Sequence, residues 1–156
     1  MDDNANLRQH AVALLRGGQA YELLADVLKD FSIKQRGAIP KGAQHSPWQI
    51  LDHMVRTLED ILEFSDNANG KYKAKNWPKD YWSKKPLGDW SASVRAYKAA
   101  MKRMESLVKD KKRNLFEPFP WGDGQTLMRE ALLAADHQAY HIGELVMLKR
   151  WLDAEE

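Results

Sequence analysis

The sequence contains no cysteine, and this absence removes several classes of protein at once. Disulfide-stapled folds, thiolate zinc fingers and enzymes with a cysteine nucleophile are all excluded. Histidine and the carboxylates are then the only strong metal-binding side chains in the chain. Any metal site in this protein must be built from nitrogen and oxygen ligands.

Long apolar runs and a large excess of one charge are also missing. No uninterrupted apolar stretch approaches the roughly twenty residues that span a bilayer. The first residues are acidic and polar, unlike the basic and then apolar layout of a signal peptide. Lys and Arg total 24 against 22 Asp and Glu, and the net charge of +2 gives no general attraction to nucleic acid. We therefore predict a cytoplasmic protein with neither a nucleic-acid nor a membrane partner.

What remains is the composition of an ordinary globular domain. Hydrophobic residues make up 44% of the 156 residues and charged residues 29%, which allows both a core and solubility. A chain of this length fits one domain comfortably and two only poorly. We predict a single domain over residues 1–156.

Apolar residues recur at helical spacing from about Asn6 to Phe31, which predicts a first helix. Gly17 and Gly18 interrupt it, and a pair of glycines indicates a bend or close packing at that point. The next segment, Ser32 to Gln44, contains two glycines and a proline and cannot continue the helix. We predict that it is a connection.

Three more helices follow. Ser46 in front of Pro47 has the pattern of an N-cap followed by proline at the first helical position, so a second helix begins here and fades at Asn67. Asp89 is a good N-cap for a third helix. A last helix of about seven turns is predicted over Gln125 to Leu152.

The longest connection, Lys71 to Gly88, falls between the second and third helices. It is rich in aromatic residues, which makes disorder improbable and favours an ordered crossover. No segments alternate convincingly over a strand length. The sequence therefore predicts an all-α fold, a four-helix bundle with one long crossover between helices two and three.

His137 and His141 are the residues of greatest chemical interest. Side chains four apart lie side by side on one helix face, where two imidazoles can bind one metal ion. The same face carries Leu133, Ala134 and Leu148, so it points inward, and two buried histidines without partners would be costly. We predict that the pair forms half of a metal site.

Glu130 and Glu144 fall on the same face at one-turn and two-turn offsets. Either could accept a hydrogen bond from an imidazole or reach the metal directly. The alternative for both is a solvated glutamate at the edge of the apolar stripe. The sequence leaves this choice open.

His53, in the second helix, is the natural third ligand, because an inward side chain of one helix in an antiparallel bundle can meet a pair from another. His45 competes with it from the loop before Ser46, where exposure is the simpler expectation. Asp52 and Asp136 each precede a histidine and point about 100° away from it around the helix, so neither is expected to bind the same ion.

Aromatic residues of two loops could wall a pocket over the metal. They are Trp77, Tyr81 and Trp82 of the crossover, and Phe119 and Trp121 of the loop before the last helix. The alternative is simple packing at the end of the bundle, and this is the interpretation we favour from the sequence.

The two histidine segments, Trp48-Gln-Ile-Leu-Asp-His53 and Asp136-His-Gln-Ala-Tyr-His-Ile-Gly143-Glu-Leu, resemble those of the DinB-like (YfiT-like) superfamily of metal-dependent proteins. The resemblance implies an up-down-down-up bundle in which His53, His137 and His141 bind the metal and water completes the shell. It also implies a homodimer. Known activities in the family include thiol S-transfer and isomerisation, and fold does not decide between them.

Three functional hypotheses follow from the residues and the resemblance. In the first, the protein is a metal-dependent hydrolase or thiol S-transferase that acts on a small-molecule or thiol substrate, because three histidines leave coordination positions open. In the second, it binds a metal or a small molecule without catalysis, as a stress-related or sensor protein. In the third, the histidines only pack. Imidazole ligands suit zinc or nickel, and also iron.

Overall fold

The computed structural model describes residues 3–83 and 89–156, and that part of the chain is helical. The helices are α1 (Asp3–Arg16), α2 (Leu24–Lys29), α3 (Ile33–Arg36), α4 (Pro47–Ser65), α5 (Trp90–Lys109) and α6 (Leu127–Ala154). The described residues form no strand, and their one extended pairing is an isolated bridge between Pro118 and Thr126. The predicted all-α class is confirmed.

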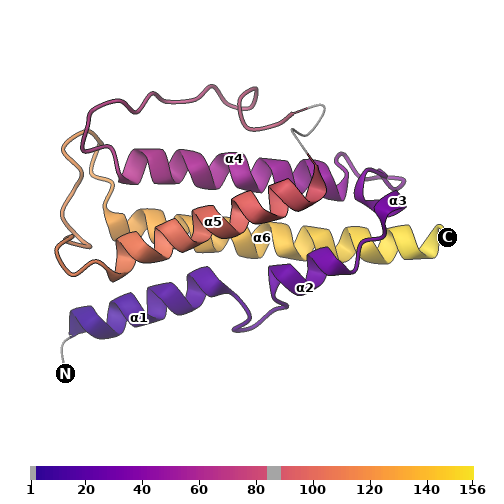
Figure 1. Ribbon diagram of the computed structural model, residues 1–156, viewed down its shortest axis with the longest axis horizontal. Coiled ribbons are helices and arrows are strands. Elements are labelled where there is room, and N and C mark those ends of the chain that lie inside the picture. Colours follow the sequence, from indigo (N-terminus) through magenta and orange to yellow (C-terminus); the bar gives the residue numbers. More distant parts are fainter. Residues whose placement is uncertain (1–2, 84–88) are drawn as a thin grey trace.

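The four long helices pack lengthwise against one another (Figure 1). α6 contacts α4 on one side and α1 on the other, and α5 contacts the same two helices. In the view of Figure 1, α1 and α6 run from left to right, whereas α4 and α5 run from right to left. The segment after α4 passes along that helix before the chain enters α5. Of the predicted crossover, residues 84–88 lie outside the described residues.

The prediction of one continuous first helix from Asn6 to Phe31 is wrong. α1 ends at Arg16 and α2 begins at Leu24, because Gly17 and Gly18 both adopt positive φ, at 72° and 68°. Two successive residues in the left-handed region cannot continue a right-handed helix. The close packing expected at the glycines is present, since a Cβ on Gly17 would lie 3.3 Å from the Gln138 side chain of α6.

The predicted connection from Ser32 to Gln44 contains one turn of helix, α3, which the sequence analysis missed. Ser32 and Gln35 form a capping box: the Gln35 amide donates to the Ser32 hydroxyl, and the Ser32 amide donates to the Gln35 side chain. Gln35 also donates to Asp153 of α6 at 2.9 Å. This turn therefore fixes the connection against the end of α6.

The starts of the three longest helices follow their capping residues. α4 begins at Pro47 after a Ser46 N-cap, and α5 begins after an Asp89 N-cap, both as predicted. α6 begins at Leu127 because Thr126 caps it, two residues later than predicted, and it continues past Leu152 to Ala154. Its 28 residues bring the predicted histidine face against α4.

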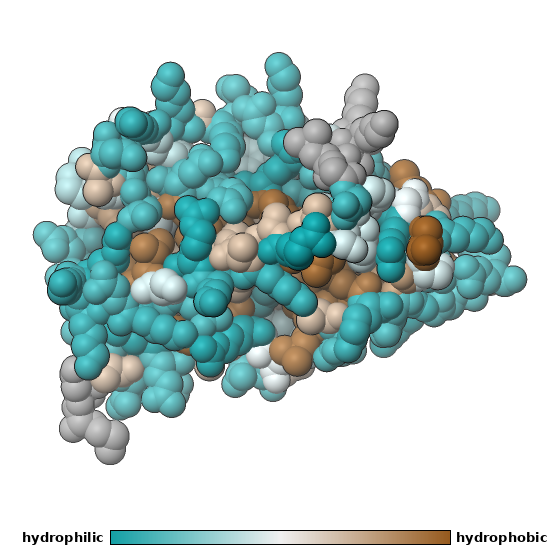
Figure 2. Space-filling model, viewed as in Figure 1, coloured by the Kyte–Doolittle hydropathy of each residue, from teal (hydrophilic) through white to brown (hydrophobic). Residues whose placement is uncertain are grey.

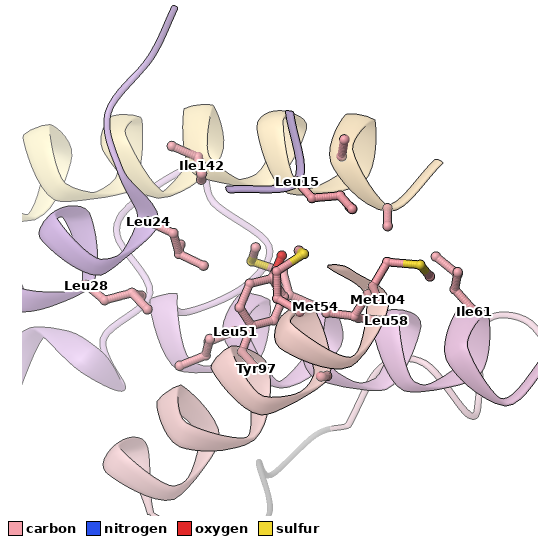
Figure 3. Close-up of a cluster of buried hydrophobic side chains, with 14 of the residues drawn as sticks. Leu15, Leu24, Leu28, Leu51, Met54, Leu58, Ile61, Tyr97, Met104 and Ile142 are labelled. Atoms are coloured by element: carbon pink, nitrogen blue, oxygen red, sulfur yellow. The ribbon is translucent and has the colours of Figure 1, made fainter. Parts of the chain in front are cut away.

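The core is formed by apolar side chains from five helices that point toward one another (Figure 3). Those labelled there are Leu15, Leu24, Leu28, Leu51, Met54, Leu58, Ile61, Tyr97, Met104 and Ile142. On the face shown in Figure 2, hydrophilic residues surround apolar side chains that show between α5 and the α1–α2 pair. Within the described residues, no helix is long and apolar enough to cross a membrane.

Candidate metal centre

Three histidines from two helices meet at one point between α4 and α6. α4 contributes His53, and α6 contributes His137 and His141. The Nε2 atom of His137 lies 3.0 Å from that of His53 and 3.1 Å from that of His141. Across residues 3–83 and 89–156, these three form the one group of His, Asp or Glu side chains close enough together to hold a metal ion.

The second ring nitrogens of two of these histidines already have acceptor partners. His53 Nδ1 lies 3.1 Å from the backbone oxygen of Tyr81, and His141 Nδ1 lies 2.8 Å from Oε2 of Glu144. A carbonyl and a carboxylate only accept, so each Nδ1 must carry the proton and donate it. In the neutral imidazole this leaves a lone pair on Nε2. Both lone pairs point into the centre of the group.

A metal ion satisfies the three convergent nitrogens better than hydrogen bonds between the rings would. His137 Nε2 carries at most one hydrogen, which cannot satisfy two lone pairs with good geometry. Zn–N bonds of about 2.0–2.1 Å at tetrahedral angles place ligand nitrogens about 3.3 Å apart. The two spacings from His137 Nε2 are close to this value. The donor set and its fixed tautomers therefore suit a divalent cation with imidazole ligands.

The protein environment keeps two of these imidazoles, those of His53 and His137, neutral. His53 and His141 are buried, and His137 is half-buried. Burial lowers the pKa of His53 to about 4, and burial together with the neighbouring imidazoles lowers the pKa of His137 to about 3. Near neutral pH no proton competes with a metal for either ring.

The three histidines lie in the wall of a cleft of about 610 Å³ between α4, α6 and the crossover. Trp82 stacks on His53 with ring centroids 3.9 Å apart and on His45 at 3.8 Å. Trp77 approaches the edge of His53 at 6.3 Å. Aromatic rings therefore limit the approach of solvent to the convergent imidazole nitrogens, while the cleft stays large enough for a small molecule.

The family follows from a comparison with known proteins. The family model described as the DinB superfamily matches residues 17–145, a span that contains all three histidines. The chain belongs to the DinB superfamily. No curated protein and no solved structure gave a match. The resemblance seen in the histidine segments is confirmed, and the helical fold agrees with it.

The two aromatic loops of this DinB protein have different roles: one lines the cleft, and the other only packs against the bundle. Trp77, Tyr81 and Trp82 line the cleft beside the histidines, so for them the favoured expectation of simple packing is wrong. The packing interpretation holds for the other loop: Trp121 donates to the backbone oxygen of Phe64 at 2.8 Å, and Phe119 packs on the Phe64 ring. Of these two aromatic loops, the crossover is the one whose described residues line the cleft.

The competing ligands fall outside the group of three. Glu144 binds His141 Nδ1 and so acts as the hydrogen-bond acceptor, one of its two predicted roles. Glu130 is buried and accepts from Arg129 at 2.7 Å. His45 lines the cleft, but it stacks on Trp82 and is not in the convergent group.

Asp52 and Asp136 are likewise absent from the group, as expected. Asp52 pairs with Arg56 at 2.7 Å, and Asp136 is exposed.

Sequence reasoning missed the contribution of the crossover backbone. The Tyr81 carbonyl sets the tautomer of His53, and the Tyr81 hydroxyl donates to Asp60 of α4 at 2.6 Å. Burial and the Asp60 carboxylate raise the pKa of Tyr81, which keeps this hydroxyl protonated. No side-chain pattern announces a backbone acceptor, whereas Asp60 is a carboxylate seven residues after His53 and could have been noticed.

Proposed function

We propose that this DinB-superfamily protein is a divalent-metal-dependent enzyme that performs hydrolysis or thiol S-transfer at a three-histidine centre of His53, His137 and His141. The observation that carries the proposal is the convergence of three Nε2 atoms, two of them with fixed lone pairs, at the wall of a cleft. A structural zinc site is closed by a fourth protein ligand, whereas a catalytic one keeps a position open.

A divalent ion in such a centre lowers the pKa of a coordinated water or thiol and so supplies a nucleophile at neutral pH. The chain's own residues prepare the site for this chemistry. Glu144 and the Tyr81 carbonyl hold His141 and His53 in the metal-binding tautomer. Trp82 covers the His53 ring and excludes water from one side of it.

The second candidate is a protein that binds a metal or a small molecule without turnover, and the shape of the site argues against it. A glutamate that closed the ligand set would favour a binding role. Glu130 pairs with Arg129, and the Glu144 oxygen that was a candidate ligand accepts from His141 instead. The centre is left open toward the cleft, which supports the enzyme.

The metal we propose is zinc or nickel, with iron as the next choice. Three neutral imidazoles are borderline ligands that suit these ions and disfavour calcium or magnesium, which prefer oxygen. The substrate is a small molecule that the 610 Å³ cleft can admit.

Elemental analysis of untagged protein tests the proposal. We expect about one equivalent of zinc, nickel or iron per chain, and loss of that metal in His53→Ala. His10→Ala is the matched control, because His10 is exposed on α1 and is not part of the group. Equal metal content, or none, in parent and His53→Ala would mean that the histidines only pack.

We also propose that residues 1–156 form one domain with the up-down-down-up topology, supported by the opposite directions of the helices in Figure 1. A cytoplasmic homodimer remains part of the proposal. Its support is the outer face of α6, where Tyr140, Met147 and Trp151 are exposed at helical spacing. Light scattering on the eluting protein tests the dimer, and a monomer mass at micromolar concentration would contradict it.

A further inference from the structure

The cleft continues past the histidines along α4. Thr57 and Asp60 follow His53 by one and two helical turns, and both line the same cleft. Side chains at this spacing lie on one helix face. At 1.5 Å per residue, Asp60 lies about 10 Å along the helix from His53. α4 thus holds these two polar side chains at fixed distances along the helix from His53.

Two polar atoms of this stretch are buried without hydrogen bonds. They are Oγ1 of Thr57 and Oδ1 of Asp60. The other oxygen of Asp60 accepts from the Tyr81 hydroxyl, and the residue as a whole is only 9% exposed. Buried polar atoms are normally paired, and an exception in the wall of a ligand cleft marks a place where a ligand donor would complete the pairing.

Among the described residues that line the cleft, the charged side chains are acidic. Asp60 and Glu144 are its carboxylates, and none of the described residues that line it is a lysine or an arginine. Lys75, which is outside the lining, lies 3.7 Å from Oδ1 of Asp60 and is shared with Glu63 at 3.3 Å. In the part of the chain that the structure describes, the Asp60, Glu63 and Glu144 carboxylates therefore outnumber the Lys75 ammonium group.

The walls of the cleft favour a cation as well. Trp77 contributes an aromatic ring to the wall, whereas the ring of Trp82 is already stacked on His45 and His53. The negative face of an aromatic ring attracts an ammonium group, most strongly where water is excluded. Acceptors without hydrogen bonds, the excess of carboxylate among the described lining residues and the Trp77 ring point to the same chemistry.

We propose that Thr57 and Asp60 form a specificity subsite for a substrate that carries a protonated amine about 10 Å from the group bound at the metal. The ammonium donates to Oγ1 of Thr57 and to Oδ1 of Asp60, and a carboxylate tail of the same length is repelled. This inference rests on the metal centre proposed above and names the substrate class that the centre serves.

The test uses the full-length protein loaded with Co²⁺ and three thiols of equal length. They are 6-amino-1-hexanethiol, 6-mercapto-1-hexanol and 6-mercaptohexanoate, which share a thiolate for the metal and differ only in the tail. Thiolate binding is followed by its charge-transfer absorption with cobalt. At pH 7 and low salt we expect the aminothiol to bind at least tenfold more tightly than the mercaptocarboxylate, with the alcohol between them.

The variants separate the subsite from the rest of α4. Asp60→Asn keeps an oxygen that can accept from Tyr81 and should reduce the preference to about twofold or less. Thr57→Val, which is isosteric, should reduce it by a smaller factor and decides the question if Asp60→Asn does not fold. Glu59→Gln is the control, since Glu59 pairs with Arg103 at 2.9 Å outside the cleft and should leave the preference unchanged.

The outcomes distinguish the two proposals. If cobalt does not bind, the metal centre is wrong and the subsite falls with it. If cobalt binds but the three thiols bind equally or not at all, only the subsite is wrong. An equal loss of preference in Glu59→Gln and Asp60→Asn would also overturn the subsite, because the effect would then be general electrostatics of α4.

Discussion

Helix α6 carries buried polar side chains on two of its faces, and they differ in how their hydrogen bonds are completed. Toward α1 and α5, Gln138 accepts from the Tyr97 hydroxyl at 3.1 Å and donates to the Leu15 carbonyl at 3.1 Å. Toward α4, His137 and His141 join His53 with their lone pairs facing one another.

The difference separates a structural role from a functional one. A buried polar group that finds its partners inside the protein specifies packing, as Gln138 does where α1 stops beside α6. Buried groups whose lone pairs converge on one another need a partner from outside the chain to complete their bonding. If the distinction is right, changes on the histidine face should alter metal affinity and acid stability, and changes on the Gln138 face should alter packing stability alone.

Acid should have the largest effect, because it lowers the free energy of unfolding through the histidine face. The pKa of His53 is about 4 and that of His137 about 3 in the folded protein, against about 6.5 when unfolded. The unfolded state therefore binds more protons between these values, and stability is lost as the pH falls below about 6.5. We expect the metal-free protein to lose several kcal/mol between pH 7 and pH 3, measured by urea denaturation.

The double variant His53→Gln/His137→Gln is the control for the carboxylates, which also titrate in this range. Its stability should fall less steeply with acid than that of the parent. If the unfolding free energies of parent and variant fell with pH at the same slope, the histidines would bind as many protons in the folded state as in the unfolded state.

Removal of one ligand comes next in magnitude. His141→Ala should lower the metal affinity more than 100-fold, because two imidazoles remain and the Glu144 carboxylate loses the ring that it orients. Competition with a chromophoric chelator measures this. Gln138→Leu on the other face of α6 should leave the affinity unchanged, and a loss of similar size there would erase the distinction between the faces.

Glu144→Ala should have a smaller effect, about 10-fold to 100-fold on metal affinity, since it removes a partner of a ligand and not the ligand itself. Asp136→Ala is the matched control, an exposed carboxylate on the same helix. An unchanged affinity in Glu144→Ala would mean that the His141 tautomer needs no help from the carboxylate.

Helical periodicity explains why the site could be predicted from the sequence. The faces of α4 and α6 follow from apolar spacing, so His53, His137 and His141 could be expected to meet. Capping chemistry located the start of α4 in the same way, through Ser46 and Pro47.

Other features depend on the backbone and have no side-chain pattern. The Tyr81 carbonyl that orients His53 is a main-chain group that any residue could supply. The pair Gly17 and Gly18 is compatible with either a bend or a break, and only the two positive φ angles decide for the break. The sequence indicated that something happens at these glycines but not that the helix stops there.

The smallest expected effect is a loss of stability on the Gln138 face of α6. Gln138→Leu should cost about 1–3 kcal/mol of unfolding free energy, because the Tyr97 hydroxyl and the Leu15 carbonyl then stay buried without partners. Thermal or urea unfolding of the metal-free protein measures this, and Tyr97→Phe/Gln138→Leu should recover part of the loss by removing one unpaired group. If the stability of Gln138→Leu falls only when metal is present, then the two faces of α6 are coupled and Gln138 belongs to the metal centre after all.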